Sequence, residues 1–263
     1  MNRKKIEVLP ESFPPDIAAF LNESVIYDSS CSTLARVFYI DKDDGYYLKT
    51  ADSGSLQTEA AMTAYMYRLG ISAEVIYYNS HGDKDYLITK KIPGEDCTYP
   101  DYKYAPEKLC DTTAALLREL HDMRAENCPV KDRIRTYVNA VTAGITNRHY
   151  ESDLFKGLWE FSSFDEAKQE AENGIPYLKR EVLLHGDYCL PNIILNDWKF
   201  SGFIDVGNGG IGDRHIDILW GIWTLKYNLR TSQYTQRFID AYGRENVEYD
   251  KLRSIAAMEM IGG

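Results

Sequence analysis

The sequence predicts an α+β fold in two lobes, a small antiparallel sheet with one main helix followed by a larger, mostly helical lobe. Three observations lead to this prediction. Short runs rich in β-branched and aromatic residues fill residues 25–49, a pattern typical of antiparallel strands. Pro93 and Gly94 then break a further strand-like run, which is a natural boundary. After that break, leucines recur at helical spacing from residue 106 to residue 123.

The break sets the expected domain limits. We expect residues 1–93 to form an N-terminal lobe, with a hinge near 90–94, and residues 94–263 to form a C-terminal lobe. Within the first lobe we expect strands at 25–27, 35–40 and 46–49, each bounded by a Ser-rich or Asp/Gly-rich turn. The run 56–66 has a strong helix pattern and follows them as the main helix of this lobe.

Composition limits the class of protein. A chain of 263 residues with 44% hydrophobic residues can bury a substantial core and is too apolar for wholesale disorder. No run approaches a membrane span, and the basic N-terminus lacks the apolar core of a signal peptide. Five scattered cysteines without metal-binding spacing indicate reduced thiols in a cytoplasmic protein. The formal charge of −10 argues against a nucleic-acid partner, and it fits a polycationic substrate as well as ordinary solubility.

A lysine and a glutamate form the first candidate constellation. Lys49 ends the third expected strand, and Glu59 lies ten residues later in the expected helix. A strand lysine that holds nucleotide phosphates needs an anion to fix its side chain, and a helix glutamate does this in kinases. Such a pair is also common by chance, so it depends on a second motif that follows in the expected order.

That second motif starts at His185 and continues to Asp205. Asp187 lies two residues after His185, Asn192 lies five after Asp187, and Asp205 lies thirteen after Asn192. An acceptor hydroxyl needs a carboxylate that orients it and takes its proton, and metal ions on nucleotide phosphates need hard oxygen ligands. Asp187 fits the first task, and Asn192 and Asp205 fit the second. The sequence therefore predicts a site for phosphoryl transfer.

The alternative interpretation is two half-buried strands with ordinary polar loop residues. The tripeptide His-Gly-Asp alone does not decide between them, because it occurs again at 81–83, in an expected hairpin turn without the Asn and second Asp. At the later site the Asn, the Asp and their spacings are all present, with a strand–turn–strand around 196–197 between them.

Three segments carry a resemblance to a known family. They read His-Gly-Asp-Tyr-Cys-Leu-Pro-Asn-Ile-Ile (185–194), Phe-Ser-Gly-Phe-Ile-Asp-Val-Gly (200–207) and Gly-Asp-Arg-His-Ile-Asp-Ile (212–218). This resembles the aminoglycoside phosphotransferases, most closely the branch that phosphorylates the 3′-hydroxyl of kanamycin-type antibiotics. The resemblance extends more weakly from about residue 30 to the C-terminus and is faintest between about 130 and 174. It implies a bilobal protein-kinase-like fold, ATP or GTP with Mg²⁺, and a cationic aminosugar substrate for a monomer or weak dimer.

The resemblance also implies roles for individual residues. Ser32 would lie near the β-phosphate, although a plain hairpin turn explains its segment too. The carbonyl of Lys90 and the amide of Ile92 would hydrogen-bond the adenine at the hinge. Asp217 would brace the backbone of the catalytic loop. The leucine spacing itself places His121 at the end of a core helix, where we expect a structural residue and not a catalyst.

Two departures from the family pattern bear on the substrate. Asn208 stands where the 3′-enzymes usually have an arginine, so the guanidinium that organises that part of the pocket is absent from this position. The C-terminus lacks the usual acidic and aromatic ending and keeps only Glu259 as an acidic contact. In the variable insert, Asp153 and Glu160 would meet substrate amines, although a solvated helix face explains these carboxylates as well.

Two alternatives to an aminoglycoside kinase stay open. One is a kinase of the same fold that acts on another small amine or sugar, which the Asn208 position and the altered tail favour. The other is a non-catalytic nucleotide-binding relative, which the presence of all five expected nucleotide, metal and catalytic residues disfavours.

Overall fold

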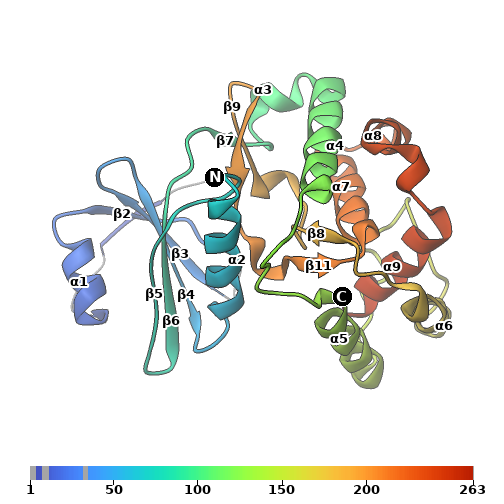
Figure 1. The fold of residues 1–263 in the computed structure, drawn as a ribbon, viewed down its shortest axis with the longest axis horizontal. Helices are drawn as coiled ribbons and strands as arrows, with labels where there is room; N and C mark the ends of the chain where they lie inside the picture. Colours follow the sequence, from blue (N-terminus) through green and yellow to red (C-terminus); the bar gives the residue numbers. More distant parts are fainter. Residues whose placement is uncertain (1–3, 8–11, 32–34, 263) are drawn as a thin grey trace. The chain divides into compact units, whose positions relative to one another are not determined.

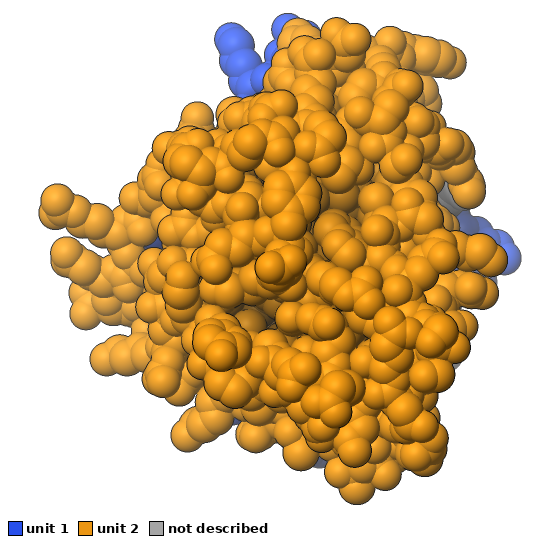
Figure 2. Space-filling view, turned by 90° about the vertical axis from the view of Figure 1, so that its right-hand side faces the viewer, with its two compact units in different colours: residues 1–94, 194–207 blue, residues 95–193, 208–263 orange. Residues whose placement is uncertain are grey.

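The computed structural model describes residues 4–7, 12–31 and 35–262. The chain divides into two compact units, unit 1 with residues 1–94 and 194–207, and unit 2 with residues 95–193 and 208–263, as coloured in Figure 2. Unit 1 contains an antiparallel sheet with one long helix, and unit 2 is mostly helical, which confirms the predicted α+β, kinase-like class. None of the helices in the described ranges is long and apolar enough to cross a membrane.

The main sheet of unit 1 is antiparallel, with the strand order β1-β2-β3-β4-β6-β5. Its strands are β1 (Lys4–Ile6), β2 (Val25–Asp28), β3 (Arg36–Asp41), β4 (Tyr46–Asp52), β5 (Val75–His81) and β6 (Lys84–Lys90). The third strand of the prediction, β4, does not end at Lys49 but continues to Asp52. It continues because Ala51 is still a core position and pairs with Asp85 of β6.

Each face of this sheet packs against one helix (Figure 1). Successive side chains of a strand point to opposite faces. Leu48 belongs to the buried cluster formed with α1 (Pro15–Leu21), and Ala51 belongs to the cluster formed with Leu56 and Ala60 at the start of α2 (Gln57–Arg68). Lys49 is two residues from Ala51, so its side chain lies on the α2 face of the sheet.

Residues 194–207 return to unit 1 as the predicted strand–turn–strand. The strands are β9 (Ile193–Asn196) and β10 (Lys199–Phe203). Asp197 and Trp198 between them have φ values of 50° and 65°, the left-handed conformation that tight hairpin turns require. At the end of β10, the hydroxyl of Ser72 donates a 2.8 Å hydrogen bond to the carbonyl of Phe203. This bond joins residues 194–207 to the first 94 residues of unit 1.

Unit 2 is built from seven α-helices of the described chain. They are α3 (Pro100–Lys103), α4 (Pro106–Asp122), α5 (Arg133–Asn147), α6 (Phe164–Gly174), α7 (Arg214–Leu229), α8 (Thr235–Tyr242) and α9 (Tyr249–Ile261). The predicted leucine helix is α4, and its Leu109 and Leu117 are fully buried. Three short strands complete the unit: β7 (Glu95–Asp96), β8 (Val182–Leu184) and β11 (Gly210–Gly212). β8 and β11 pair antiparallel with Leu184 opposite Gly210, so the chain around residue 208 lies next to the loop that follows β8.

Candidate active site

In unit 1, Lys49 is bound by two carboxylates. Its Nζ lies 2.7 Å from Glu59 Oε2 and 2.7 Å from Asp205 Oδ1. The expected lysine–glutamate contact is formed, and the ion pair with Asp205 is an addition that the sequence did not predict. Burial lowers the pKa of Lys49, but the two carboxylates outweigh burial and hold the pKa above its usual value. Lys49 is therefore a charged ammonium with a fixed direction.

Asp205 has an unusual backbone conformation. Its φ is 59°, a left-handed value that costs a residue other than glycine about 1–2 kcal/mol. The side chain is 51% exposed. Oδ1 contacts Lys49, and Oδ2 accepts no hydrogen bond from any residue in the described ranges. A carboxylate that is held in a costly conformation and keeps one oxygen open is suited to a hard cation.

In unit 2, the loop that follows β8 is held by one buried carboxylate. Asp217, in the first turn of α7, accepts hydrogen bonds from the backbone N–H groups of His185 at 2.7 Å and Gly186 at 2.8 Å. The ring of His121 lies 3.2 Å from the same carboxylate, and its other nitrogen contacts the hydroxyl of Tyr242. These contacts confirm Asp217 as the brace of this loop and His121 as a structural residue.

Asn192 fixes the direction of Asp187. The amide nitrogen of Asn192 donates to Asp187 Oδ2 at 2.9 Å and to the Asp187 carbonyl at 3.0 Å. The backbone N–H of Asp187 donates to the ring of His185 at 3.3 Å. Asn192 Oδ1 accepts no hydrogen bond within the described part of the chain, so its carbonyl oxygen is open to a cation while its nitrogen orients the candidate base.

A glycine is required at position 186, in the loop that Asp217 holds and directly before Asp187. Its φ is 84°, and a Cβ at this position would lie 1.9 Å from the carbonyl oxygen of Asn208. No side chain fits there, because ordinary contacts between carbon and oxygen are above 3 Å. The loop and the chain around Asn208 therefore pack backbone against backbone.

Asp187 opens on a small cavity within unit 2, about 80 Å³ in volume. Its other polar lining groups are Arg133, Tyr137, Asn208, Trp220 and Glu259. Glu259 is only 7% exposed and accepts a 3.0 Å hydrogen bond from the Tyr137 hydroxyl. Burial raises the pKa of Glu259 to about 7, against the opposing effect of its hydrogen-bond donors and of Arg133. The cavity thus combines a candidate base with a carboxyl that ionises near neutral pH.

A guanidinium lies where the sequence led us to expect none. Arg133, the first residue of α5, donates from Nη2 to Asn208 Oδ1 at 3.0 Å. Although position 208 has no arginine, the guanidinium of Arg133 from α5 therefore lies at this position. This corrects the expectation that the pocket lacks such a group.

The remaining predicted residues lie elsewhere. Asp153 is exposed and pairs with Lys156 at 3.7 Å, and Glu160 accepts a 2.7 Å hydrogen bond from the backbone of Gly157. Neither residue lines the cavity. Lys90 ends β6 with its ammonium 3.5 Å from Asp44, and Ile92 follows in the segment after the strand. Ser32 falls outside the described residues.

Two cavity residues on α5 were missed by the sequence analysis. Arg133 and Tyr137 are four residues apart, so both lie on one face of the helix. That spacing was a usable signal for a shared face. However, nothing local indicates which face meets the cavity, because their partners Asn208 and Glu259 are 75 and 122 residues away in sequence.

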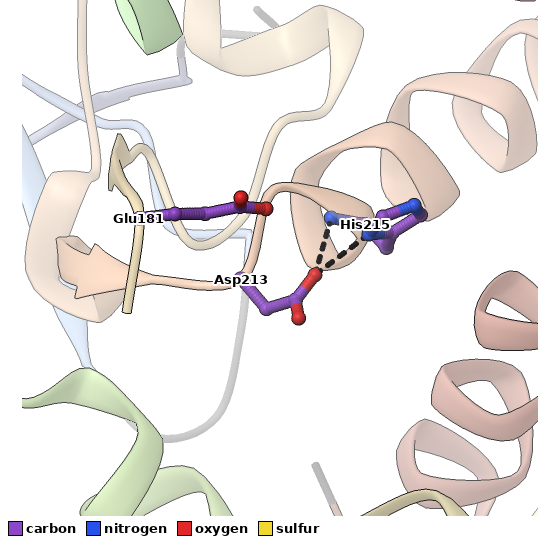
Figure 3. A group of neighbouring side chains, drawn as sticks. All are labelled: Glu181, Asp213 and His215. Carbon is purple, nitrogen blue, oxygen red and sulfur yellow. Dashed lines mark hydrogen bonds and ion pairs between the residues drawn. The ribbon is translucent and has the colours of Figure 1, made fainter. Parts of the chain in front are cut away.

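A second cluster in unit 2 has the composition of a metal site, but most of its ligand atoms are bonded to other parts of the protein. It consists of Glu181, Asp213 and His215 (Figure 3). Asp213 Oδ1 accepts from the His215 ring at 2.7 Å, and the other ring nitrogen accepts from the Glu248 backbone at 2.9 Å. Glu181 binds Arg214 at 2.9 Å. Through these bonds the cluster joins α7 to its neighbours.

Comparison with known proteins places this geometry in context. The model of the Phosphotransferase enzyme family matches residues 32–255. A protein named probable aminoglycoside 3′-phosphotransferase from Lactococcus lactis subsp. lactis (strain IL1403) is 43% identical over 263 residues, which covers 99% of both chains. A solved aminoglycoside-3′-phosphotransferase of type VIII has a TM-score of 0.71 at 22% identity and covers 89% of this chain and 91% of its own. The complex of APH(3'')-Id from Streptomyces rimosus with ADP and streptomycin has a TM-score of 0.71 at 20% identity, covering 86% and 90%. At such low identities the two structures indicate a shared fold.

Proposed function

The chain belongs to the phosphotransferase enzyme family, and from this premise we propose that it transfers the terminal phosphoryl group of ATP to a hydroxyl of an aminoglycoside. We assign the 3′-hydroxyl of kanamycin-type compounds as the acceptor, with antibiotic resistance as the result. The relative from Lactococcus lactis, 43% identical along the whole chain, supports this substrate class. The observation that carries the proposal is the position of Asp187, which is held by Asn192 and lines one cavity with Glu259.

In the proposed reaction Asp187 is the catalytic base. It accepts a hydrogen bond from the acceptor hydroxyl, directs a lone pair of that oxygen at the terminal phosphorus and takes the proton as the new bond forms. Asn192 keeps the carboxylate in one orientation through the 2.9 Å hydrogen bond. Asp217 keeps the loop in place, since it binds two consecutive backbone N–H groups. Little covalent chemistry is required of the protein, so positioning contributes most of the rate.

Lys49 is assigned to the nucleotide phosphates. Its ammonium is fixed by Glu59 and Asp205 at 2.7 Å each, so it needs no rearrangement to meet a phosphate oxygen. The backbone carbonyl of Lys90 and the amide of Ile92 are assigned to the adenine, and Ser32 to the β-phosphate.

Asn192 and Asp205 are assigned to magnesium. Each offers an oxygen that no described residue uses, and a neutral carbonyl plus a carboxylate are the hard donors that Mg²⁺ takes alongside phosphate oxygens and water. Bound there, the ion would neutralise charge that builds up on the transferring phosphoryl group.

Glu259 is assigned to a substrate ammonium group. An almost fully buried carboxyl needs a cation or a proton, and its pKa of about 7 leaves it ready to exchange one for the other. We further propose that the enzyme acts in the cytoplasm, where ATP is available, as a monomer or weak dimer.

The test is a panel assay of ATP and GTP consumption by the purified chain. The acceptors are kanamycin A and other 4,5- and 4,6-disubstituted aminoglycosides, choline, homoserine and simple sugars, and NMR of the product locates the phosphate. We expect turnover with kanamycin-type compounds and ATP, and phosphate on the 3′-oxygen. Turnover of a neutral metabolite and of no aminoglycoside would assign the chain to another small-molecule kinase of this fold.

A further inference from the structure

Arg133 is a half-buried cation whose position is fixed by the start of α5. Asp132 caps the helix by accepting a 3.1 Å hydrogen bond from the backbone of Arg135, and its other oxygen pairs with Arg180 at 2.8 Å. The cap fixes where α5 begins, so the side chain of Arg133 starts from a fixed backbone position. This side chain lines the cavity that also contains Asp187.

The guanidinium of Arg133 has only neutral partners. Nη2 donates to Asn208 Oδ1 and Nη1 donates to Thr136 Oγ1, both at 3.0 Å. Within the described ranges no carboxylate forms an ion pair with Arg133, although arginines on the surface of this unit, such as Arg237 on Asp111, are paired closely. A guanidinium has five N–H donors in a rigid fork, so donors remain for a ligand in the cavity.

The cavity is lined by two groups of opposite chemistry. Glu259 offers a carboxyl, which accepts hydrogen bonds and attracts cations. Arg133 offers donors and a positive charge that stays on at every working pH. Asp187 lines the same small space, so a group bound beside the acceptor hydroxyl is exposed to both.

We propose that Arg133, aimed by Asn208, selects a hydroxyl over an ammonium group at the substrate position next to the acceptor hydroxyl. This inference rests on the proposed function and deepens it. A hydroxyl oxygen accepts a hydrogen bond from the guanidinium fork. An ammonium group in its place has no lone pair and faces the like charge of Arg133. It therefore leaves the remaining N–H donors of the guanidinium without an acceptor.

The size of the cavity sharpens this selection. About 80 Å³ is room for roughly two or three water-sized groups, so the acceptor hydroxyl and its nearest substituents lie close to both Arg133 and Glu259. A substituent that is rejected by Arg133 cannot turn away without withdrawing the acceptor oxygen from Asp187. The proposed selection therefore changes turnover as well as binding.

Kanamycin A and kanamycin B provide a matched pair of probes. They differ only in the 2′-substituent, one of the two beside the 3′-hydroxyl, which is a hydroxyl in kanamycin A and an amino group in kanamycin B. The measurement is the ratio of kcat/KM for A to that for B, in the parent and in Arg133→Met, which keeps length and loses charge and donors. We expect the parent to favour A, and the variant to lower the ratio about tenfold, the effect of one charge-assisted hydrogen bond.

Two further variants separate selection from general damage. Arg135→Met removes an exposed arginine from the same helix and should leave the ratio unchanged. Asn208→Ala keeps the guanidinium but removes the oxygen that aims it, so it should lower the ratio by a smaller factor. Thermal unfolding shows whether each variant is folded. If Arg133→Met does not fold, Asn208→Ala provides the test.

The outcomes are distinct. If the parent phosphorylates both kanamycins and the ratio is the same in Arg133→Met and Asn208→Ala, the inference is overturned while the proposed function stands. If both variants lose activity on A and B equally, Arg133 holds the loop in place and does not select the substrate. If the parent phosphorylates neither compound, the proposed function fails first.

Discussion

The amide nitrogen of Asn192 lies 2.9 Å from Asp187 Oδ2. One residue thereby serves two tasks, because its nitrogen orients a carboxylate and its oxygen stays open for a metal ion. The hydrogen bond joins the proposed base to the proposed metal ligand within five residues of chain, so the effects of replacing either one should depend on the other.

Asp187→Asn should retain nucleotide binding and lower kcat by roughly two orders of magnitude or more, in the range of a general-base contribution. The amide keeps the shape of the side chain but cannot take the proton. Steady-state kinetics with kanamycin A, and ATP binding by calorimetry, check this. Parent-like turnover would mean that positioning and metal charge carry the reaction without a base.

Asp205→Ala should abolish activity, and added Mg²⁺ should not restore it, because the charged oxygen ligand is gone and Lys49 loses a partner at 2.7 Å. Asn192→Ala should be milder, since it removes a neutral ligand. The matched control is Asp197→Ala, an exposed aspartate in the adjacent hairpin turn. Activity of Asp205→Ala at ordinary Mg²⁺ concentrations would contradict the metal assignment.

Lys49→Met and Glu59→Gln should both raise KM for ATP, by roughly tenfold or more for the lysine. Glu59→Gln should have the smaller effect, because Asp205 still pairs with Lys49. Lys84→Met is the control, since Lys84 forms an exposed pair with Asp52 on the same sheet, and such pairs contribute about 0–1 kcal/mol. Equal kinetics for the Lys49 and Lys84 variants would remove Lys49 from the nucleotide site.

Glu259 should make both stability and substrate binding depend on pH. Burial raises its pKa from 4.5 in the unfolded chain to about 7 in the folded protein. Between these values the folded state binds more protons, so the free energy of unfolding contributed by this group falls as pH rises. At about pH 8 the free energy of unfolding of Glu259→Gln should therefore exceed that of the parent by on the order of 1–3 kcal/mol. Urea unfolding of both proteins measures this difference.

The same ionisation should favour a cationic substrate. In the parent, KM for kanamycin A should fall between about pH 6 and about pH 8 as the carboxyl of Glu259 loses its proton. The Glu259→Gln variant reports the part of the pH dependence that arises from the amines of the substrate. Identical pH profiles for parent and variant would show that Glu259 does not bind an ammonium group.

Gly186→Ala should destabilise the protein by more than about 2 kcal/mol, because the new Cβ would lie 1.9 Å from the Asn208 carbonyl oxygen. Gly82→Ala is a close control. Gly82 also has a positive φ, 63°, but nothing lies within 4 Å of the added carbon. That substitution should cost only the conformational term, about 1 kcal/mol. Urea unfolding of both variants gives the difference, and equal losses would contradict the packing argument.

The sequence predicted what short-range spacing determines. The leucine period of α4, the turn between β9 and β10, and the Asp187–Asn192 spacing are all local, and each is found in the structure. Lys49 was predicted to meet Glu59 because a strand followed by a helix brings them together.

Contacts between distant segments were not predictable in the same way. Nothing around Arg133 in sequence indicates that it binds Asn208, and nothing around Lys49 indicates that Asp205 is its second partner, 156 residues away. The end of β4 was misplaced for a related reason. The strand was expected to end at Lys49, whereas it continues to Asp52 because Ala51 is buried against α2.

The attachment of Ser72 to Phe203 has a consequence for synthesis of the protein. Unit 1 needs residues 194–207, and the hydroxyl of Ser72 must wait for the carbonyl of Phe203, which leaves the ribosome 131 residues later. At roughly 5–20 residues per second, about 7–26 seconds pass before the N-terminal unit can be completed. A ribosome stalled before residue 194 would therefore carry an N-terminal unit that lacks residues 194–207, and a nascent Lys49 that can pair with Glu59 but not yet with Asp205.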